Sequence, residues 1–151
     1  HLSTRRQRQM CIRDRLIIVR KIEHIGIAVQ DIDAAEATYT KLFGKGPYKR
    51  EVVEDQGVVT SFFKCGPNKI ELIAPLGVDS VLHEYFKKHR SGLHHMALAV
   101  YDIQAEIDRL VKEGFLPVSQ SITQGADNRR IFFFHPKSTE GVLLELCQLI
   151  D

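Results

Sequence analysis

An internal repeat constrains the fold of this chain more than any other feature. The segment HIGIAV at residues 24–29 returns as HMALAV at residues 95–100, which is 71 positions later. In each half a glutamate follows inside an apolar run, at Glu71 in ELIAPLG and at Glu145 in ELCQLI, 47 and 50 residues after its histidine. Since a period near 71 residues is too long for a solenoid, the sequence predicts two copies of one small module.

The first half has the pattern of a βαβββ unit. A β-rich stretch at residues 16–29 alternates so that small and ligand-type side chains share one face. A helix is predicted next, with Asp31 or Asp33 as its N-cap and Gly44 at its end. Turn residues then separate three short strand patterns, at residues 48–54, 58–65 and 68–74.

The second half repeats this order after a connecting segment with a predicted helix at residues 79–89. A strand is predicted at 93–100, a helix at 101–114, and three further strands at 115–120, 129–136 and 141–150. Neither four-stranded sheet buries its inner face alone. We therefore expect an α+β domain over residues 16–151, in which modules at about 21–75 and 92–149 form a curved eight-stranded sheet around a cleft.

The first fifteen residues do not follow the pattern. They contain five arginines, one aspartate and no apolar periodicity, and a basic arm that binds nucleic acid can have this composition. However, MCIRDR at residues 10–15 resembles the translation of a sequencing adapter, so we interpret 1–15 as a non-native, dispensable leader with few packed contacts. The remaining 16 basic and 18 acidic residues give a charge of −2, and we expect no nucleic-acid partner.

The composition also indicates the cellular compartment. No run approaches 18 consecutive apolar residues, so the sequence predicts no membrane span. The three cysteines, Cys11, Cys65 and Cys147, are an odd number without paired spacing. This pattern favours a reducing, cytoplasmic environment over a disulfide framework.

Four repeated residues, His24, Glu71, His95 and Glu145, are the candidate metal ligands. If the modules fold alike, each histidine lies on a first strand and each glutamate on a last strand, and pseudo-twofold pairing brings all four into one cleft. A single strand histidine is more often a core residue, and a single glutamate often faces solvent. Two imidazoles and two carboxylates at equivalent positions instead favour a divalent metal such as Co, Zn, Ni, Mn or Fe.

The other histidines are assigned no ligand role. His94 is expected on the opposite sheet face from His95, because side chains alternate along a strand. His83 and His89 belong to the polar connecting helix, and His135 precedes a proline in a predicted loop.

In these segments the chain resembles the vicinal oxygen chelate superfamily, and within it the methylmalonyl-CoA epimerases. The resemblance extends from about Lys21 to Gln148 and is carried by HIGIAVQDIDAA, DQGV, ELIAPLG, SGLHHMALAV and HPKSTEGVLLELCQ. It implies that the four candidate ligands hold the metal, with cobalt preferred and zinc, manganese or nickel as alternatives. It also implies an acyl-CoA substrate and a homodimer.

The implied reaction interconverts (2R)- and (2S)-methylmalonyl-CoA by removing the proton alpha to the thioester. A metal would stabilise the enolate, while Glu145 and Glu71 would remove and return the proton. One position departs from the family pattern. Where some relatives carry a further glutamate, this chain has Thr60, which cannot act as a base near neutral pH.

The sequence indicates the substrate contacts less specifically than the metal ligands, and it leaves rival functions open. Arg129, Arg130 and Lys137 are candidates for binding the phosphates of coenzyme A, with a solvated loop and strand end as the alternative reading. A glyoxalase I-type lactoylglutathione lyase would use the same four ligands. A non-catalytic resistance-type protein of the same fold would need no metal ligands, and an extradiol dioxygenase is disfavoured by Glu71.

Overall fold

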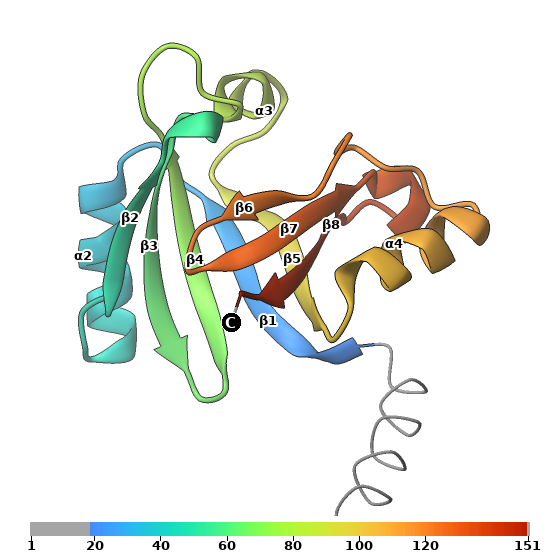
Figure 1. The fold of residues 1–151 in the computed structure, drawn as a ribbon. Helices are drawn as coiled ribbons and strands as arrows, with labels where there is room; N and C mark the ends of the chain where they lie inside the picture. Colours follow the sequence, from blue (N-terminus) through green and yellow to red (C-terminus); the bar gives the residue numbers. More distant parts are fainter. Residues whose placement is uncertain (1–18, 151) are drawn as a thin grey trace, which may run out of the picture.

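The computed structural model describes residues 19–150, which form one curved eight-stranded sheet with two long helices against its outer side and a shorter connecting helix over one end (Figure 1). The predicted leader, residues 1–15, lies outside the described residues. The first module contains β1 (Val19–Ala28), α2 (Ile32–Phe43), β2 (Lys49–Val53), η1 (Glu54–Gln56), β3 (Val58–Cys65) and β4 (Asn68–Pro75). The connecting helix α3 (Leu82–Lys88) leads to β5 (Gly92–Val100), α4 (Ile103–Lys112), β6 (Thr123–Gly125), β7 (Arg129–Phe134), η2 (Pro136–Thr139) and β8 (Leu143–Leu149).

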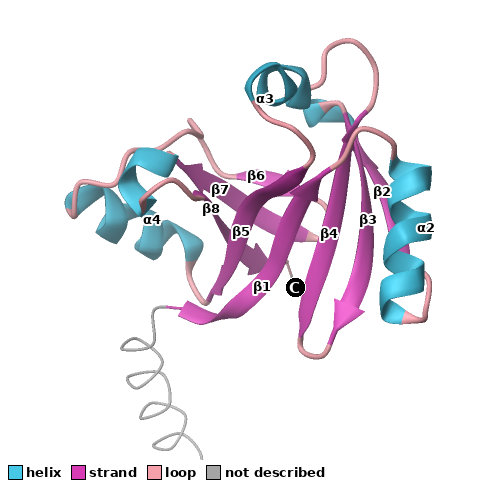
Figure 2. Ribbon diagram, turned by 180° about the vertical axis from the view of Figure 1, so that it is seen from behind, coloured by secondary structure: helices cyan, strands magenta, loops and turns pink. Residues whose placement is uncertain are grey.

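The strand order confirms the predicted α+β architecture of paired modules. The order is β2-β3-β4-β1-β5-β8-β7-β6, so each module contributes four adjacent strands. Antiparallel pairing of β1 with β5 joins the modules at the centre, and parallel pairs β1–β4 and β5–β8 flank it. Figure 2 shows α2 and α4 on the outer side of opposite halves of the curved sheet. The edge strands of the whole sheet are therefore β2 and β6.

Local sequence explains where the two long helices begin and end. The carboxylate of Asp31 accepts hydrogen bonds from the backbone N–H groups of Asp33 and Ala34, which makes Asp31 the N-cap of α2. Gly44 ends the helix with a φ of 71°, a conformation that glycine adopts without strain. At the equivalent place in the second module, Asp102 caps α4 through the N–H of Ala105.

One predicted strand is wrong. Residues 115–120 form no strand; they make only an isolated bridge between Pro117 and Phe134. Proline has no backbone N–H to donate and interrupts the hydrogen-bond ladder. The edge strand of this module is instead β6, which pairs with β7 through the turn around Asp127.

The central β1–β5 pairing contains three register shifts, and two of them are β-bulges at equivalent places, each directly before a candidate ligand. In β1 the extra residue is Glu23, directly before His24, and in β5 it is His94, directly before His95. A bulge interrupts the strict alternation of side chains and re-aims the extra residue. Both residues are consequently on the same side of the sheet as the histidine that follows.

Two apolar layers lie between the outer helices and the sheet. The cluster under α4 is the larger, and the cluster under α2 contains Phe63 and Leu72. The inner, concave side of the sheet keeps polar residues at its centre. None of the helices in residues 19–150 has both the length and the apolar content that crossing a membrane requires.

Candidate metal centre and active site

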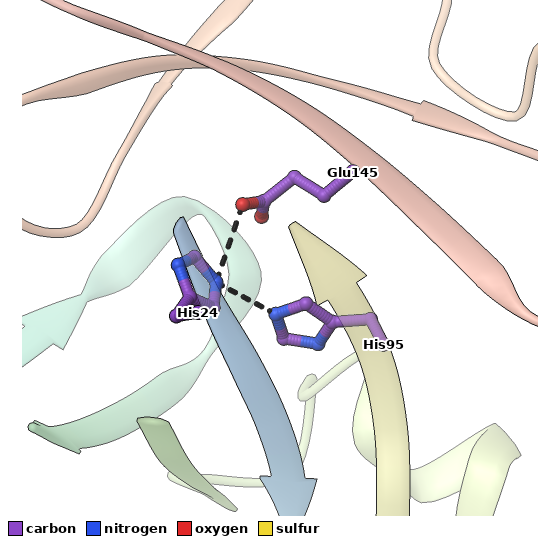
Figure 3. A group of neighbouring side chains, drawn as sticks. All are labelled: His24, His95 and Glu145. Carbon is purple, nitrogen blue, oxygen red and sulfur yellow. Dashed lines mark hydrogen bonds and ion pairs between the residues drawn. The ribbon is translucent and has the colours of Figure 1, made fainter. Parts of the chain in front are cut away.

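The four candidate ligands lie on the four central strands of the sheet. His24 is on β1, Glu71 on β4, His95 on β5 and Glu145 on β8, and all four are buried, with 5–6% of each residue exposed. Figure 3 shows His24, His95 and Glu145 directing their polar atoms toward one another. The pseudo-twofold arrangement that the repeat predicts therefore brings the four side chains together.

The distances between their polar atoms suit a single metal ion. His24 Nε2 is 3.0 Å from His95 Nε2, 3.3 Å from Glu145 Oε2 and 3.6 Å from Glu71 Oε2. His95 Nε2 is 3.7 Å from Glu71 Oε1. Two atoms that each bind one metal at about 2.1 Å lie at most about 4.2 Å apart. Every measured separation is below this limit.

Gly26 makes room for one of these rings. A Cβ atom on Gly26 would lie 2.0 Å from Cε1 and 2.2 Å from Nδ1 of His95. Because His95 is the residue opposite Gly26 in the β1–β5 pairing, any larger side chain would displace the imidazole. Gly26, one of the small residues of β1, thus has a direct role in forming the site.

Burial sets the ionisation of the group. It lowers the pKa of His24 to about 4 and the pKa of His95 well below its usual value, so both rings are neutral and have a lone pair to offer. Burial raises the pKa values of Glu71 and Glu145, and neighbouring carboxylates raise them further. Glu145 Oε2 is buried without a hydrogen-bond partner. A divalent cation would offset the cost of ionising both carboxylates, so the donor set fits the predicted metal.

A cavity of about 310 Å³ opens beside these residues, between the two modules. Glu71, His95 and Glu145 are part of its wall, and so are the polar side chains of Gln56 and Thr60. Its remaining walls are mainly apolar and include Val53, Ile73, Val81, Val118, Ile131, Phe133 and Leu143. A small ligand bound in this cavity would therefore place a polar group against the carboxylates and an apolar group against the remaining walls.

Thr60 faces this cavity but offers no base. It is 2% exposed, and its hydroxyl donates a hydrogen bond of 3.2 Å to the backbone oxygen of Glu51. In the described lining of the cavity, the carboxylates are those of Glu71 and Glu145.

The expected position of His94 is wrong. Its ring lines the cavity, and its Nδ1 lies 2.9 Å from Nδ1 of His95. The prediction assumed unbroken alternation along β5, whereas the bulge at His94 brings the two rings to the same side. His135, in contrast, is part of loop architecture as predicted, because its ring accepts a hydrogen bond from the N–H of Lys137.

The three candidate coenzyme A contacts occupy different environments. Arg129 points to the concave side, where its guanidinium lies 3.1 Å from Glu23. Arg130, the next residue of β7, is exposed, and Lys137 is exposed in η2. None of the three belongs to the described lining of the cavity. Their contact with coenzyme A stays a prediction.

The sequence analysis did not identify an ion network beside the site, which we call the clasp. Lys69 Nζ lies 2.6 Å from Glu23 and 2.7 Å from Asp127, and Glu23 also pairs with Arg129. Asp127 accepts a further hydrogen bond of 3.1 Å from the hydroxyl of Tyr48. Since Tyr48 adjoins β2 and Asp127 follows β6, the clasp connects the two edges of the sheet. The pairing of these residues depends on the curvature of the sheet, so no local pattern indicated it.

The chain is similar to proteins of a known family. Residues 23–133 match the family model described as the Glyoxalase/Bleomycin resistance protein/Dioxygenase superfamily. The uncharacterized protein YqjC of Bacillus subtilis is 36% identical over 130 residues, covering 86% of this chain and 93% of that protein. The human protein named mitochondrial methylmalonyl-CoA epimerase is 33% identical over 129 residues, covering 85% of this chain and 73% of its own.

Two solved structures have the same fold. Methylmalonyl-CoA epimerase from Mycobacterium tuberculosis superposes with a TM-score of 0.82 at 33% identity, covering 89% of this chain and 91% of that one. A variant of the Streptomyces coelicolor epimerase in complex with 2-nitronate-propionyl-CoA superposes with a TM-score of 0.83 at 31% identity. That match covers 88% of this chain and 99% of the other.

Proposed function

Because the chain belongs to the glyoxalase/bleomycin resistance protein/dioxygenase superfamily, we propose that it is a metal-dependent methylmalonyl-CoA epimerase. The resemblance to the vicinal oxygen chelate superfamily is thereby confirmed, and relatives named as this epimerase match most of the chain. The observation that carries the proposal is the pair of buried carboxylates, Glu71 and Glu145, which come from opposite modules and face one cavity.

The metal would be held by His24, Glu71, His95 and Glu145. His24 Nε2 lies 3.0–3.6 Å from a polar atom of each of the other three residues, and the two imidazole rings are neutral. The donor atoms of His24, His95 and Glu145 all lie within 4.8 Å of one another, and Glu71 would complete the set. When bound there, a divalent cation supplies Lewis-acid stabilisation of the negative charge that develops as the substrate loses its proton. Cobalt is the preferred metal, with zinc, manganese or nickel as alternatives.

Glu145 and Glu71 would transfer the proton. Epimerisation requires removal of the proton from the carbon between the thioester and the carboxylate and its return to the opposite face. One carboxylate oxygen would take the proton from that carbon, and the other glutamate, as a carboxylic acid, would deliver one from the other side. Metal coordination would lower the basicity of a carboxylate, so the glutamate that takes the proton would have to loosen from the metal to act. Thr60 takes no part in the transfer.

The cavity would accommodate the acyl part of the substrate. Apolar residues such as Ile131 and Phe133 would surround the methyl group and exclude water from the carbanion-like centre. Arg130 and Lys137 are exposed and free to approach phosphates, whereas Arg129 is paired with Glu23. Cytoplasmic location and homodimeric assembly stay predictions of the sequence analysis; Cys65 and Cys147 are both free thiols.

A single assay separates this function from its nearest rival. We would incubate the protein with cobalt, manganese or zinc in deuterated water and follow deuterium entry into (2R)- and (2S)-methylmalonyl-CoA, alongside lactoylglutathione formation from the hemithioacetal of glutathione. We expect metal-dependent exchange into both epimers and no lactoylglutathione. The reverse result would contradict the epimerase. His24→Ala tests the metal centre, and His135→Gln, outside the site, is its matched control.

A further inference from the structure

We propose that His94 is a positioning residue, which accepts a hydrogen bond from Nδ1–H of His95 and so directs the Nε2 lone pair of His95 at the metal centre. This inference rests on the proposed metal centre. It adds a residue outside the four ligands and predicts which nitrogen of each ring carries the hydrogen.

The bulge in β5 is what makes the contact available. Adjacent residues of a regular strand point to opposite faces, so His94 and His95 would be separated by the sheet. Since His94 is the extra residue between two paired positions, its ring turns to the side of His95. Nδ1 of one ring is then 2.9 Å from Nδ1 of the other, and the rings are nearly perpendicular at 88°.

The direction of this hydrogen bond follows from the other end of the His95 ring. Nε2 of His95 faces His24 Nε2 at 3.0 Å and Glu71 Oε1 at 3.7 Å, so it is the nitrogen that points into the donor set. A neutral imidazole has one N–H and one lone pair. If Nε2 keeps its lone pair for a metal, Nδ1 must carry the hydrogen and donate it. His94 Nδ1 is the acceptor within reach, which places the hydrogen of His94 on Nε2.

Packing against the connecting helix holds His94 in this orientation. The ring of Tyr85, on α3, meets the ring of His94 edge to face with centroids 4.7 Å apart. Tyr85 is itself held on its other side by His89, at 4.6 Å in a stacked arrangement. Its hydroxyl donates to the backbone oxygen of Leu93, the residue before His94. The segment that links the two modules therefore supports the orientation of a proposed ligand.

Support of this kind has a known magnitude. Metal-binding histidines in proteins usually donate their second N–H to an acceptor, and loss of that acceptor weakens metal binding about 10- to 100-fold. In this protein the acceptor is a second histidine rather than a carboxylate or a backbone carbonyl.

The test compares four proteins for metal binding and for ring tautomers. His94→Phe keeps an aromatic ring against Tyr85 and removes the acceptor, and His94→Gln restores an acceptor oxygen. His89→Phe is the matched control, because His89 also stacks on Tyr85 and does not contact His95. Cobalt and manganese affinities would be measured by calorimetry, and histidine tautomers of the metal-free wild type by long-range ¹H–¹⁵N NMR. Circular dichroism would establish that each variant is folded.

We expect cobalt to bind His94→Phe about 10- to 100-fold more weakly than wild type, with most of the loss recovered in His94→Gln and none seen in His89→Phe. We expect His95 to carry its hydrogen on Nδ1 and His94 on Nε2. Affinity of His94→Phe within twofold of wild type, or hydrogen on Nε2 of His95, would overturn the positioning role and leave the epimerase standing. A wild type that binds neither metal would overturn the proposed metal centre and this inference together.

Discussion

The two modules have the same order of elements but use equivalent positions for different tasks. The N-caps Asp31 and Asp102 and the first helical residues Ile32 and Ile103 are each 71 positions apart, like His24 and His95. What differs is how each helix packs and what each bulged residue contacts. A duplicated backbone therefore does not imply duplicated side-chain roles.

The helices show the first difference. In α4, Ile103, Ile107 and Leu110 are all buried against the sheet. In α2 no residue reaches that degree of burial, and the contact is made by partly buried side chains such as Tyr39 and Phe43. The second module has the better covered outer face, so it should contribute more to stability through its helix.

The bulges show the second difference. Glu23 turns into the clasp, where it pairs with Lys69 and Arg129, while His94 turns to His95. The backbone geometry is shared, because both bulges lie one residue before a candidate ligand in the same strand pair. One bulged residue thus pairs with charged side chains of both modules, and the other contacts a candidate metal ligand.

The largest expected effect comes from the two carboxylates. We expect Glu145→Gln and Glu71→Gln each to lower epimerase turnover about 10²- to 10⁴-fold, because each removes one proton-transfer group. The two should differ in stereochemistry: each variant should lose deuterium exchange from one epimer of methylmalonyl-CoA and retain it from the other. Exchange and epimerisation would be followed separately for each epimer.

An exposed glutamate, Glu113→Gln, is the control for this pair. Turnover within tenfold of wild type in both variants would contradict the assignment of the acid and the base. Loss of exchange from the same epimer in both would mean that the modules do not serve opposite faces.

The clasp should matter next, for stability. We expect Glu23→Gln to lower the free energy of unfolding at pH 7 by about 3–5 kcal/mol, since it leaves Arg129 and Lys69 short of a buried partner. Burial opposes ionisation of Glu23, but Lys69 and Arg129 outweigh it and hold its pKa below the usual value. The ionised native form therefore stabilises the fold above the unfolded pKa of 4.5, and this stability is lost as the pH falls through the native pKa.

Urea unfolding of wild type and Glu23→Gln at several pH values checks this. The difference between the two should be full at neutral pH and should shrink below pH 4.5. The surface pair between Glu84 and Lys87 is the control, and Glu84→Gln is expected to leave the free energy of unfolding nearly unchanged, because both side chains are exposed. A pH-independent difference would mean that Glu23 acts through packing and not through its charge.

Alanine substitution of the equivalent isoleucines, Ile32 and Ile103, tests whether α2 and α4 contribute differently to stability. We expect Ile103→Ala, in the buried face of α4, to cost about 2–5 kcal/mol of unfolding free energy. Ile32→Ala, on the half-buried face of α2, should cost less than half as much, because less apolar surface is removed from contact. Equal costs, measured by urea unfolding, would show that the two helices cover the sheet equally well.

The helix caps should give the smallest effect. Asp31→Ala and Asp102→Ala should each destabilise the protein by about 0.5–2 kcal/mol. Asp31 should be the more costly, because it accepts two backbone N–H hydrogen bonds where Asp102 accepts one. Thermal melting of both variants checks the order, with the asparagine variants as controls that keep an acceptor. A larger loss at Asp102 would mean that cap strength follows helix burial instead of hydrogen-bond number.

Much of the fold and the identity of the four clustered residues followed from the sequence alone. Helix caps, turns and alternating strands depend on neighbours along the chain. Gly44 and the strand at residues 58–65 were therefore predicted correctly, and the N-cap is Asp31, one of the two predicted candidates. The repeat then related His24 to His95 through symmetry, since equivalent strands of two like modules must meet at a shared axis. These conclusions needed no knowledge of which strand pairs with which.

Tertiary structure decided what depends on register and curvature. Alternation along β5 placed His94 away from His95, and only the pairing with β1 shows the bulge that turns it back. The clasp forms only because the sheet curves enough to bring Asp127 into contact with Tyr48, next to β2. The segment around Pro117 makes an isolated bridge, and β6 is the edge strand instead. Residues far apart in the sequence set these features jointly. The sequence by itself therefore determined the modules and the four candidate ligands, whereas the pairing of strands determined which neighbouring side chains contact each candidate.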